Sequence, residues 1–519
     1  MQNQVVDVVI VGAGLSGIGA ASWLGMKLPR KSYVVLEGRD DVGGTWDLFR
    51  YPGVRSDSDM HTLGFSFHPW KDRDAIAAAG KIKRYIGDTI DKFGVRPNLR
   101  LGHKVVSAKW STDRARWRIV AERKDGVTVS FDARFLFMGS GYYNYTAGYQ
   151  PRFEGQEQFA GKIVHPQFWP DDLDYQGKRV VVIGSGATAV TLIPALAKDV
   201  EHITMLQRSP TYILAAPGQD RIANFFKSWF PASAAYLAAR WKNVLIGRAL
   251  RWYMTRNPQK MRPLVLRLMH KALPDHCDKA DFTPRHEPMQ QRVCLAPNGD
   301  FFKALRSRQA SVVTGEIDRL VSDGVLLKSG EKLTADIIVT ATGLKLQRGG
   351  NVDISVDGEP LNFVRTVIYK GAMYSNVPNF MLVFGYTVAS WTLKADLVAR
   401  YLIRVLKRMD AAGVDIAVPV ADVDAMKTTW MIPHFTSGYI VRAREGMPRQ
   451  GFDAPWQVHQ EYLKDRKIML RQPVDDGVLK LLKAGQPWRL PGGKGDRFIF
   501  APSGENKSVS FSRDVVDSR

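Results

Sequence analysis

Two glycine-rich loops, each directly after a run of apolar residues, constrain the fold more than any other feature. The first run, residues 7–11, leads into GAGLSG at 12–17, and the second, residues 179–183, leads into GSGATA at 184–189. A continuous apolar run that ends in glycine is typical of a central parallel strand covered on both faces. The glycines of such a loop permit a tight turn, a close approach to a pyrophosphate and close packing of helix on strand. The sequence therefore predicts an α/β fold with two Rossmann-like dinucleotide-binding domains.

The residues around the first loop favour FAD or NAD. The loop residues expected to hold the cofactor are Gly12, Gly14, Ser16 and Gly17. A further apolar run, residues 33–36, ends in Glu37, about twenty residues beyond the loop. A carboxylate there can accept both ribose hydroxyls of an adenosine, which argues against a 2′-phosphorylated nucleotide.

The second loop has the features of an NADPH site. Ala189 replaces its third glycine, and the next apolar run, residues 202–206, ends in Arg208 rather than in an acid. Arg208 and the Ser209 hydroxyl can bind a 2′-phosphate through charge-assisted hydrogen bonds; the alternative is that Arg208 is a solvated charge. The residues expected to bind NADPH here are Gly184, Ser185, Gly186, Ala187, Thr188, Ala189, Val190, Gln207, Arg208 and Ser209.

Between the loops lies the pattern FxGxxxHxxxWP. Its fixed positions are Phe159, Gly161, His165, Trp169 and Pro170. Taken singly, these residues can be ordinary packing residues and a turn cap. Together they resemble the fingerprint of Baeyer–Villiger monooxygenases, class B flavoenzymes that insert one oxygen atom beside a ketone carbonyl.

Residues 43–59, GGTWDLFRYPGVRSDSD, resemble the segment of class B flavin monooxygenases that wraps the flavin. Other motifs, such as RYPGVRSDSDM, SGYYNY, LQRSPTY and SWTLKADL, resemble the branch that contains ethionamide-activating monooxygenase. This resemblance implies that Thr45, Trp46, Asp47, Leu48, Asp57 and Val105 contact FAD, and that Arg55 and Ser56 contact NADPH. The alternative for this segment is a Pro/Gly turn with solvated aspartates.

The resemblance also implies a reaction. NADPH reduces FAD, O₂ adds to the flavin C4a, and the resulting peroxide attacks a carbonyl to give an ester or lactone. Arg292, in the sequence QRVC, stands where the family has its active-site arginine. A fixed cation there would stabilise the negative charge that develops, and Asp57 would hold it in place. The alternative for Arg292 is a structural salt bridge.

The motifs suggest a domain order. Residues 1–144 and 341–519 are expected to form the FAD domain with a C-terminal extension, of which 502–506 reads as loose. Residues 145–212 and 291–340 are expected to form the NADPH domain, and 213–290 a helical insertion within it. No oligomeric state is predicted.

Composition limits the remaining functions. The chain has 519 residues, 45% of them hydrophobic, and a net charge of +22. Its two cysteines, Cys277 and Cys294, lack the spacing of a redox, disulfide or metal framework, so a reducing cytoplasm fits best and no metal is expected. No secretory signal is seen, and two long uncharged stretches, 8–26 and 371–393, read as strands and loops rather than membrane spans.

Residues 221–271 contain eleven Lys or Arg and no acid, interleaved with aromatics. This pattern suits the anionic inner face of a membrane; the alternative is a solvated basic face. Nucleic acid binding is not expected, because a nucleotide-cofactor enzyme explains the rest of the chain.

The expected function is thus NADPH- and O₂-dependent oxidation of small apolar ketones, with sulfides and thioamides as further substrates. Two alternatives remain open: heteroatom or long-chain alkyl oxygenation as the main activity, and a flavin-dependent quinone reductase.

Overall fold

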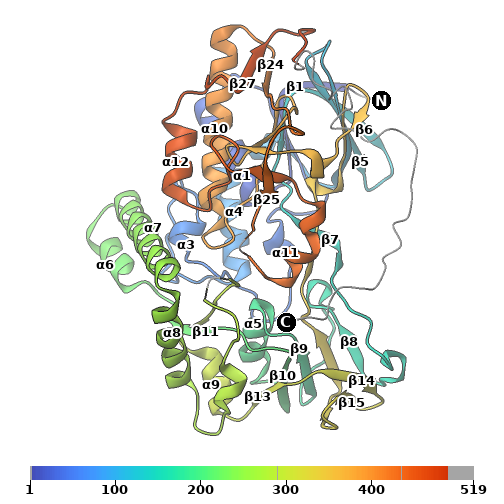
Figure 1. The fold of residues 1–519 in the computed structure, drawn as a ribbon, viewed down its shortest axis with the longest axis vertical. Coiled ribbons are helices and arrows are strands. Elements are labelled where there is room, and N and C mark those ends of the chain that lie inside the picture. The colour runs from blue at the N-terminus through green and yellow to red at the C-terminus, as the bar shows by residue number, and fades with distance from the viewer. Residues whose placement is uncertain (1–2, 289, 434, 489–519) are drawn as a thin grey trace.

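The computed structural model describes residues 3–288, 290–433 and 435–488. Its largest sheet has nine strands in the order β20-β19-β4-β5-β6-β1-β2-β3, with β23 paired to β6 (Figure 1). The strands are β1 (Asn3–Val11), β2 (Tyr33–Leu36), β3 (Leu99–Arg100), β4 (His103–Ser111), β5 (Arg116–Arg123), β6 (Thr128–Met138), β19 (Asp353–Val356), β20 (Glu359–Pro360) and β23 (Phe380–Leu382).

Strand β1 lies inside this sheet between β6 and β2, and it is parallel to both. Its side chains alternate between two cores: Val8 and Ile10 pack among the helices, whereas Val9 and Val11 pack against the opposite face. Both faces of the strand are thus buried, which explains its continuous apolar run. The helices that contribute to the first core are α1 (Leu15–Lys27), α4 (Ala79–Lys92) and α10 (Trp391–Ala412).

The second sheet has five strands in the order β13-β10-β9-β17-β8, all parallel. They are β8 (Lys162–Val164), β9 (Arg179–Ile183), β10 (His202–Gln207), β13 (Ala310–Thr314) and β17 (Ile337–Thr340). Helices α5 (Ala187–Leu196) and α9 (Asp300–Arg306) contribute to its core. This sheet lies at the lower end of the molecule in Figure 1 and the nine-stranded sheet at the upper end. The predicted α/β fold with two Rossmann-like domains is confirmed.

Two short strands join the sheets. β7 (Tyr143–Gly148) leaves the nine-stranded sheet after β6, and β18 (Leu344–Leu346) returns from β17. They pair antiparallel, with Leu344 opposite Gly148. Because both strands run between the two sheets, this pair is where the chain crosses from one domain to the other.

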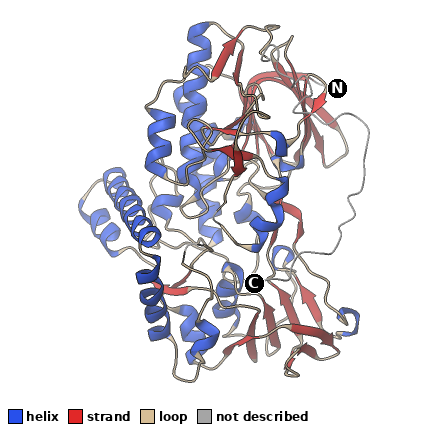
Figure 2. Ribbon diagram, viewed as in Figure 1, coloured by secondary structure: helices blue, strands red, loops and turns tan. Residues whose placement is uncertain are grey.

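The basic segment forms α6 (Arg221–Trp229), α7 (Ala232–Arg256) and α8 (Pro258–Ala272), which gather on one side of the molecule (Figure 2). Helix α8 contributes Met261, Val265 and Met269 to the core of the second domain. Helix α7 contributes Met254 to the same core and also packs on the first domain, where Arg240 Nη1 donates to the His61 and Gly64 carbonyl oxygens at 2.9 and 2.8 Å. The segment therefore contacts both domains.

The remaining elements complete these domains. The helices are α2 (Thr45–Leu48), α3 (Met60–Leu63), α11 (Gly438–Ala443) and α12 (Tyr462–Leu470). The strands are β11 (Ile213–Ala216), β12 (Cys294–Pro297), β14 (Ile317–Val321), β15 (Gly324–Leu327), β16 (Lys332–Thr334), β21 (Ile368–Tyr369), β22 (Met373–Tyr374), β24 (Ile416–Pro419), β25 (Thr428–Trp430), β26 (Arg449–Gly451) and β27 (Leu479–Leu482). Within the described ranges no helix combines the length and apolarity needed to span a bilayer. Residues 502–506 lie outside the described residues.

Candidate active site

The first glycine-rich loop turns the chain from β1 into α1 with little space for side chains. Gly12 has φ +99°, and a Cβ there would lie 2.9 Å from Gly139 O. A Cβ on Gly17 would collide with Gly12 O. Gly14 begins α1 without a side-chain cap, so the first backbone N–H groups of the helix are free to bind an anion. The loop therefore fits a pyrophosphate.

Glu37 closes the same site. Its carboxylate accepts hydrogen bonds from the Ala13 and Arg39 backbone N–H groups at 2.7 and 3.0 Å. Burial raises the pKa of Glu37, and the two backbone hydrogen bonds and Arg39 partly oppose this. His103 N donates to Glu37 O at 2.7 Å, which brings the start of β4, and with it Val105, beside the predicted ribose-binding acid.

The predicted flavin-wrapping segment begins against the first loop. Gly43 N donates to Ala13 O at 3.0 Å, and the short helix α2 then carries Thr45, Trp46, Asp47 and Leu48. Asp47 is buried and accepts from Arg39 and Lys83 at 2.6 Å each. Burial alone would raise the pKa of Asp47, but the hydrogen bonds from Lys83 and Arg39 lower it. Asp47 thus stays ionised and fixes α2 against α4.

The same segment reaches the second domain. A Cβ on Gly53, which has φ +78°, would lie 2.7 Å from Ala195 Cβ and 2.8 Å from Thr191 O, both on α5. Only glycine therefore permits this approach, and one loop touches the helices of both nucleotide sites.

The second glycine-rich loop repeats the geometry of the first. Gly184 has φ +127°, and a Cβ there would collide with Ala341 O. Gly186 begins α5 without a side-chain cap, and no atom lies within 4 Å of where its Cβ would be. Ala189 and Val190 are buried in the core behind the loop. Arg208 and Ser209 are exposed at the end of β10, where the Ser185 hydroxyl donates to Ser209 O at 3.2 Å.

Three further residues predicted to bind NADPH also have protein partners. The Ser56 hydroxyl accepts from Ala77 N at 3.1 Å, and the Gln207 amide donates to Asp281 O at 2.7 Å. Arg55 pairs with Asp300 at 2.5 Å. Ser56 and Gln207 are buried, so their side chains support the loops in this structure.

The fingerprint lies on the crossing between the domains. His165 accepts from Gln167 N at 3.2 Å through Nδ1, so its Nε2–H donates to Gly343 O, also at 3.2 Å. A Cβ on Gly148 would collide with the His165 ring, so His165 touches both β7 and the turn before β18. Burial lowers the pKa of His165, opposed by the Gly343 hydrogen bond, and the ring is neutral at pH 7. Phe159 is buried, Gly161 packs on its ring, and Trp169 and Pro170 are half-buried.

The predicted catalytic pair is formed. Arg292 Nη1 donates to Asp57 Oδ2 at 2.5 Å, and both side chains are about 40% exposed (39% and 40%). Burial alone would lower the pKa of Arg292, but the Asp57 carboxylate outweighs it and raises that pKa. Arg292 is therefore a permanent cation with one carboxylate partner.

Aromatic residues for which the sequence predicted no role lie around this pair. Tyr142 stacks on Trp391, with centroids 5.0 Å apart, and the Trp391 indole donates to Ser16 Oγ at 2.8 Å. Tyr142, Tyr143 and Tyr439 are close enough to Arg292 to affect its pKa. The sequence signals were SGYYNY for Tyr142 and Tyr143 and SWTLKADL for Trp391, whereas Tyr439 lies in neither motif.

A cavity of about 1270 Å³ is lined by Ser58, which follows Asp57 directly, and by Leu295. Its apolar wall includes Leu295, Met431 and Phe435, and Leu295 lies three residues beyond Arg292. Arg248 and Glu461, paired at 2.8 Å, also line it. Ligand pockets typically measure roughly 300–1,000 Å³, so this one has room for a large apolar substrate.

Relatives of this chain are flavoproteins. The protein named FAD-containing monooxygenase EthA from Mycobacterium tuberculosis is 48% identical over 486 residues, covering 93% of this chain and 98% of the relative. Probable FAD-binding monooxygenase AlmA from Acinetobacter baylyi is 42% identical over 475 residues, covering 91% and 95%.

Solved structures share the fold. A cyclohexanone monooxygenase from Rhodococcus, bound to NADP⁺, aligns with a TM-score of 0.74 at 20% identity over 93% of this chain and all of that chain. An oxidised steroid monooxygenase bound to NADP aligns with a TM-score of 0.72 at 21% identity over 92% and 100%. Residues 6–346 match the family described as flavin-binding monooxygenase-like. Since this match spans most of the chain and the relatives align along more than nine-tenths of it, the predicted resemblance is confirmed, and the protein belongs to the flavin-binding monooxygenase-like family.

Proposed function

We propose that this protein is an FAD- and NADPH-dependent monooxygenase that converts apolar ketones into esters or lactones and also oxidises sulfides and thioamides. The observation that carries the proposal is the Arg292–Asp57 pair, since Ser58 and Leu295, close to the pair in the chain, line the large cavity. Bound FAD, once reduced by NADPH, supplies the activation of O₂. Gly12, Gly14, Ser16, Gly17 and Glu37 would hold it, and the loop at 184–190 with Arg208 and Ser209 would hold NADPH.

Arg292 has the properties that ketone oxygenation requires. Oxygen insertion beside a carbonyl develops negative charge on the carbonyl oxygen, and a preorganised cation stabilises that charge. Asp57 accepts a hydrogen bond from Nη1 of the guanidinium, and Arg292 has four further N–H groups with which to donate. Asp57 is thus a positioning residue, and Arg292 the group that would touch the substrate.

The test is product formation by Arg292→Ala. This variant is expected to keep FAD and NADPH binding and to lose ester formation by roughly 10²- to 10³-fold, the usual effect of removing one such stabiliser. Arg285→Ala, which removes an exposed arginine from the same loop region, is the matched control. Products of linear ketones, cyclic ketones and thioethers are measured together with oxygen uptake.

The outcomes separate the candidates. Ester formation by the wild type, lost in Arg292→Ala, supports the proposal. Sulfoxide or alcohol as the sole product would favour heteroatom or alkyl oxygenation. NADPH oxidation with a quinone and without oxygen uptake would favour a reductase. Near-normal ester formation by Arg292→Ala would move the catalytic role to another residue.

We also propose that α6 and α7 rest on an anionic membrane surface, from which the enzyme takes apolar substrate. Phe225, Trp229 and Trp252 are 58%, 74% and 53% exposed, an unusual set for a protein surface. Exposed basic residues, including Arg221 and Arg256, stand among them. Aromatics with basic residues on a helix are typical of interfacial attachment.

Vesicle sedimentation tests this attachment. The wild type is expected to bind anionic but not zwitterionic vesicles and to be released by high salt, because each basic residue contributes about 1 kcal/mol near such a surface. Phe225→Ser/Trp229→Ser is expected to bind less. Phe452→Ser, which removes another phenylalanine that is 58% exposed, is the control. Equal binding to both vesicle types would leave these helices as a solvated basic face.

A further inference from the structure

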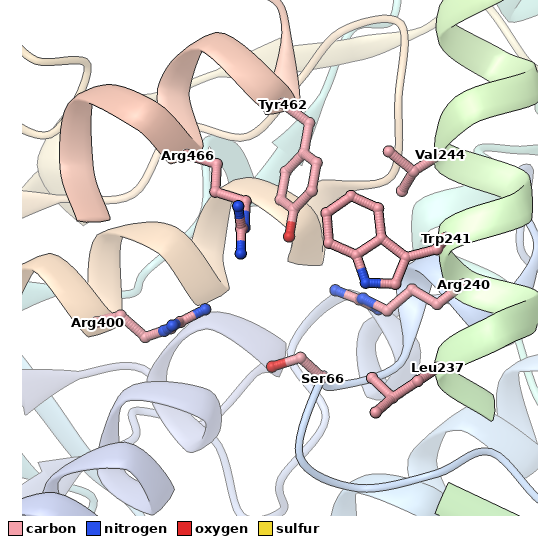
Figure 3. A pocket seen from close by; sticks show the side chains of 8 residues that line it. All are labelled: Ser66, Leu237, Arg240, Trp241, Val244, Arg400, Tyr462 and Arg466. Atoms are coloured by element: carbon pink, nitrogen blue, oxygen red, sulfur yellow. The ribbon is translucent and has the colours of Figure 1, made fainter. Parts of the chain in front are cut away.

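A small second cavity, of about 140 Å³, is lined by three arginines from three separate elements. Arg240 comes from α7, Arg400 from α10 and Arg466 from α12. Figure 3 shows their guanidinium groups turned towards one centre, together with the hydroxyls of Tyr462 and Ser66. Distant parts of the chain thus bring like charges together, which needs a physical reason.

Arg240 is the buried member of the set. Its side chain is only 3% exposed, and Nη1 donates to the backbone oxygens of His61, Thr62 and Gly64. Nη2 is buried without a hydrogen-bond partner among the described residues. A buried charged donor left unpaired is costly, and Arg240 is one of the residues that line the cavity.

The other two arginines also lack a carboxylate partner. Arg400 lies over the Trp23 ring and Arg466 over the Trp241 ring, each with Cζ 5.3 Å from the centroid. No ion pair or hydrogen bond of either side chain is found in residues 3–288, 290–433 and 435–488. The indole faces hold both guanidinium groups in place while their N–H groups stay available.

One carboxylate lies nearby, and its oxygens are already used. Asp396 accepts from Trp23 Nε1 at 2.7 Å and from the Ser66 hydroxyl at 2.9 Å. The three arginines carry three positive charges and Asp396 carries one negative charge. Two positive charges therefore remain without compensation. Tyr462 adds a neutral donor, because burial raises the pKa of its hydroxyl and keeps it protonated.

This cavity is separate from the predicted nucleotide sites. Trp391 contacts Ser16 at the start of α1, whereas Arg400 lies over Trp23, seven residues further along that helix. Since an α-helix rises 1.5 Å per residue, Trp23 lies roughly 10 Å along α1 from the predicted phosphate-binding turn. Val244 and Tyr462 line both this cavity and the large one, so they form the wall between them.

We propose that the three-arginine cavity binds a phosphate group, either free phosphate or the phosphate monoester of a lipid headgroup. A phosphate monoester carries about −1.5 to −2 charges at pH 7, which matches the two uncompensated positive charges. Guanidinium groups bind phosphate oxygens through paired hydrogen bonds. The cavity also exceeds by several-fold the roughly 30 Å³ that one water occupies. This site goes beyond the proposed oxygenation and does not depend on it.

The first test is thermal unfolding of the FAD-loaded protein against inorganic phosphate at constant ionic strength. Saturating NADP⁺ is included so that the nucleotide sites do not respond. The wild type is expected to show a saturable rise in Tm. In Arg400→Gln/Arg466→Gln the rise should be abolished, and each single variant should weaken phosphate binding by about tenfold.

The matched control is Lys407→Gln/Lys467→Gln. It removes the same charge from the same two helices, at exposed positions away from the cavity. This variant should keep the wild-type response. No saturable response in the wild type, or equal responses in the two double variants, would overturn the proposal.

A second arm identifies the source of the phosphate. A soluble short-chain phosphatidic acid is added in competition with inorganic phosphate. If the lipid displaces phosphate when its concentration is lower than that of the phosphate, and if this displacement is lost in Arg400→Gln/Arg466→Gln, the cavity is assigned to a lipid headgroup. Saturable phosphate binding without such displacement assigns it to the free anion. NADPH oxidation measured in parallel keeps this result distinct from the oxygenation reaction.

Discussion

At the scale of single residues, Arg208 is the position that should decide the choice of nucleotide. It is exposed at the end of β10, beside the Ser209 carbonyl that accepts from Ser185. A 2′-phosphate there would gain hydrogen bonds to a charged donor, worth about 1.5–3 kcal/mol. Arg208→Ala should therefore raise KM for NADPH by roughly 10- to 100-fold and leave kcat and the NADH kinetics nearly unchanged.

Steady-state kinetics with both nucleotides measure this effect. Lys198→Ala removes an exposed charge from the same domain and should change neither KM. A wild type with equal kcat/KM for NADPH and NADH would contradict the assignment of the second loop to NADPH.

His165 should make stability depend on pH. Both ring nitrogens are used by a neutral ring, Nδ1 as acceptor and Nε2–H as donor, and the folded pKa lies below the ordinary value of about 6.5. The unfolded chain therefore takes up the proton first, so stability is lost as pH falls through about 6.5. His165→Gln removes this pH-dependent contribution to stability.

Melting curves from about pH 8 to 5 test the prediction. The Tm of the wild type should fall more steeply than that of His165→Gln below about pH 6.5. Since other histidines also have lowered pKa values, among them His286 and His459, only the difference between the two curves is informative. If the Tm of the two proteins fell in parallel with pH, protonation of His165 would not destabilise the fold.

At the scale of elements, a buried ion pair ties α10 to α12. Lys394 Nζ and Asp465 Oδ2 are 2.8 Å apart, their side chains are 2% and 3% exposed, and the Tyr386 hydroxyl donates to the same oxygen at 2.7 Å. Removing one partner of such a pair leaves an uncompensated buried charge, at a cost of about 3–5 kcal/mol. Asp465→Asn should therefore unfold at much lower denaturant concentration.

The surface provides the control. Asp475 pairs with Arg408 between the same helix, α10, and the chain after α12, but both side chains are more than 40% exposed (42% and 45%). Asp475→Asn should cost about 0–1 kcal/mol. Similar losses for the two variants in urea unfolding would show that the buried pair adds no specific stability.

The elements also show which features could be predicted. The two glycine-rich loops are local, because strand, turn and helix start follow one another in the chain, and the sequence placed both. Glu37 was predictable from its distance to the loop. The packing of α7 on the first domain was not, because it depends on Arg240 meeting carbonyls at His61 and Gly64, about 180 residues away. The Arg55–Asp300 pair was not predictable for the same reason, because its two residues are far apart in the chain.

The candidate active site also has features that could be predicted from the sequence and features that could not. Family resemblance predicted that Asp57 holds Arg292, and in the structure the two side chains are 2.5 Å apart. The side chains of Ser56 and Gln207 point into the protein, since a sequence motif specifies the position of a residue but not which neighbour competes for its polar atoms. The large cavity has no sequence signature, because its wall is assembled from five or more separate segments.

At the scale of the whole molecule, the β7–β18 crossing connects the two domains. His165 lies between Gly148 at the end of β7 and Gly343 before β18. Residues of the flavin-wrapping segment touch α5 from the other side, at Gly53. We therefore expect a change in domain arrangement on nucleotide binding to alter these contacts, and His165 is placed to transmit it.

His165→Ala should consequently slow turnover and increase the fraction of NADPH oxidised without product, while FAD content stays at the wild-type level. The FAD loop at Gly12 and Gly17 makes no contact with His165, so its geometry should survive. Gln158→Ala, an exposed change just before the same motif, is the control. Product yield per NADPH, with FAD content from absorbance, measures the effect. If His165→Ala lost FAD, the role of His165 would be structural. If turnover slowed but the product yield per NADPH stayed normal, His165 would affect only the speed of the domain change and not the coupling of NADPH oxidation to oxygenation.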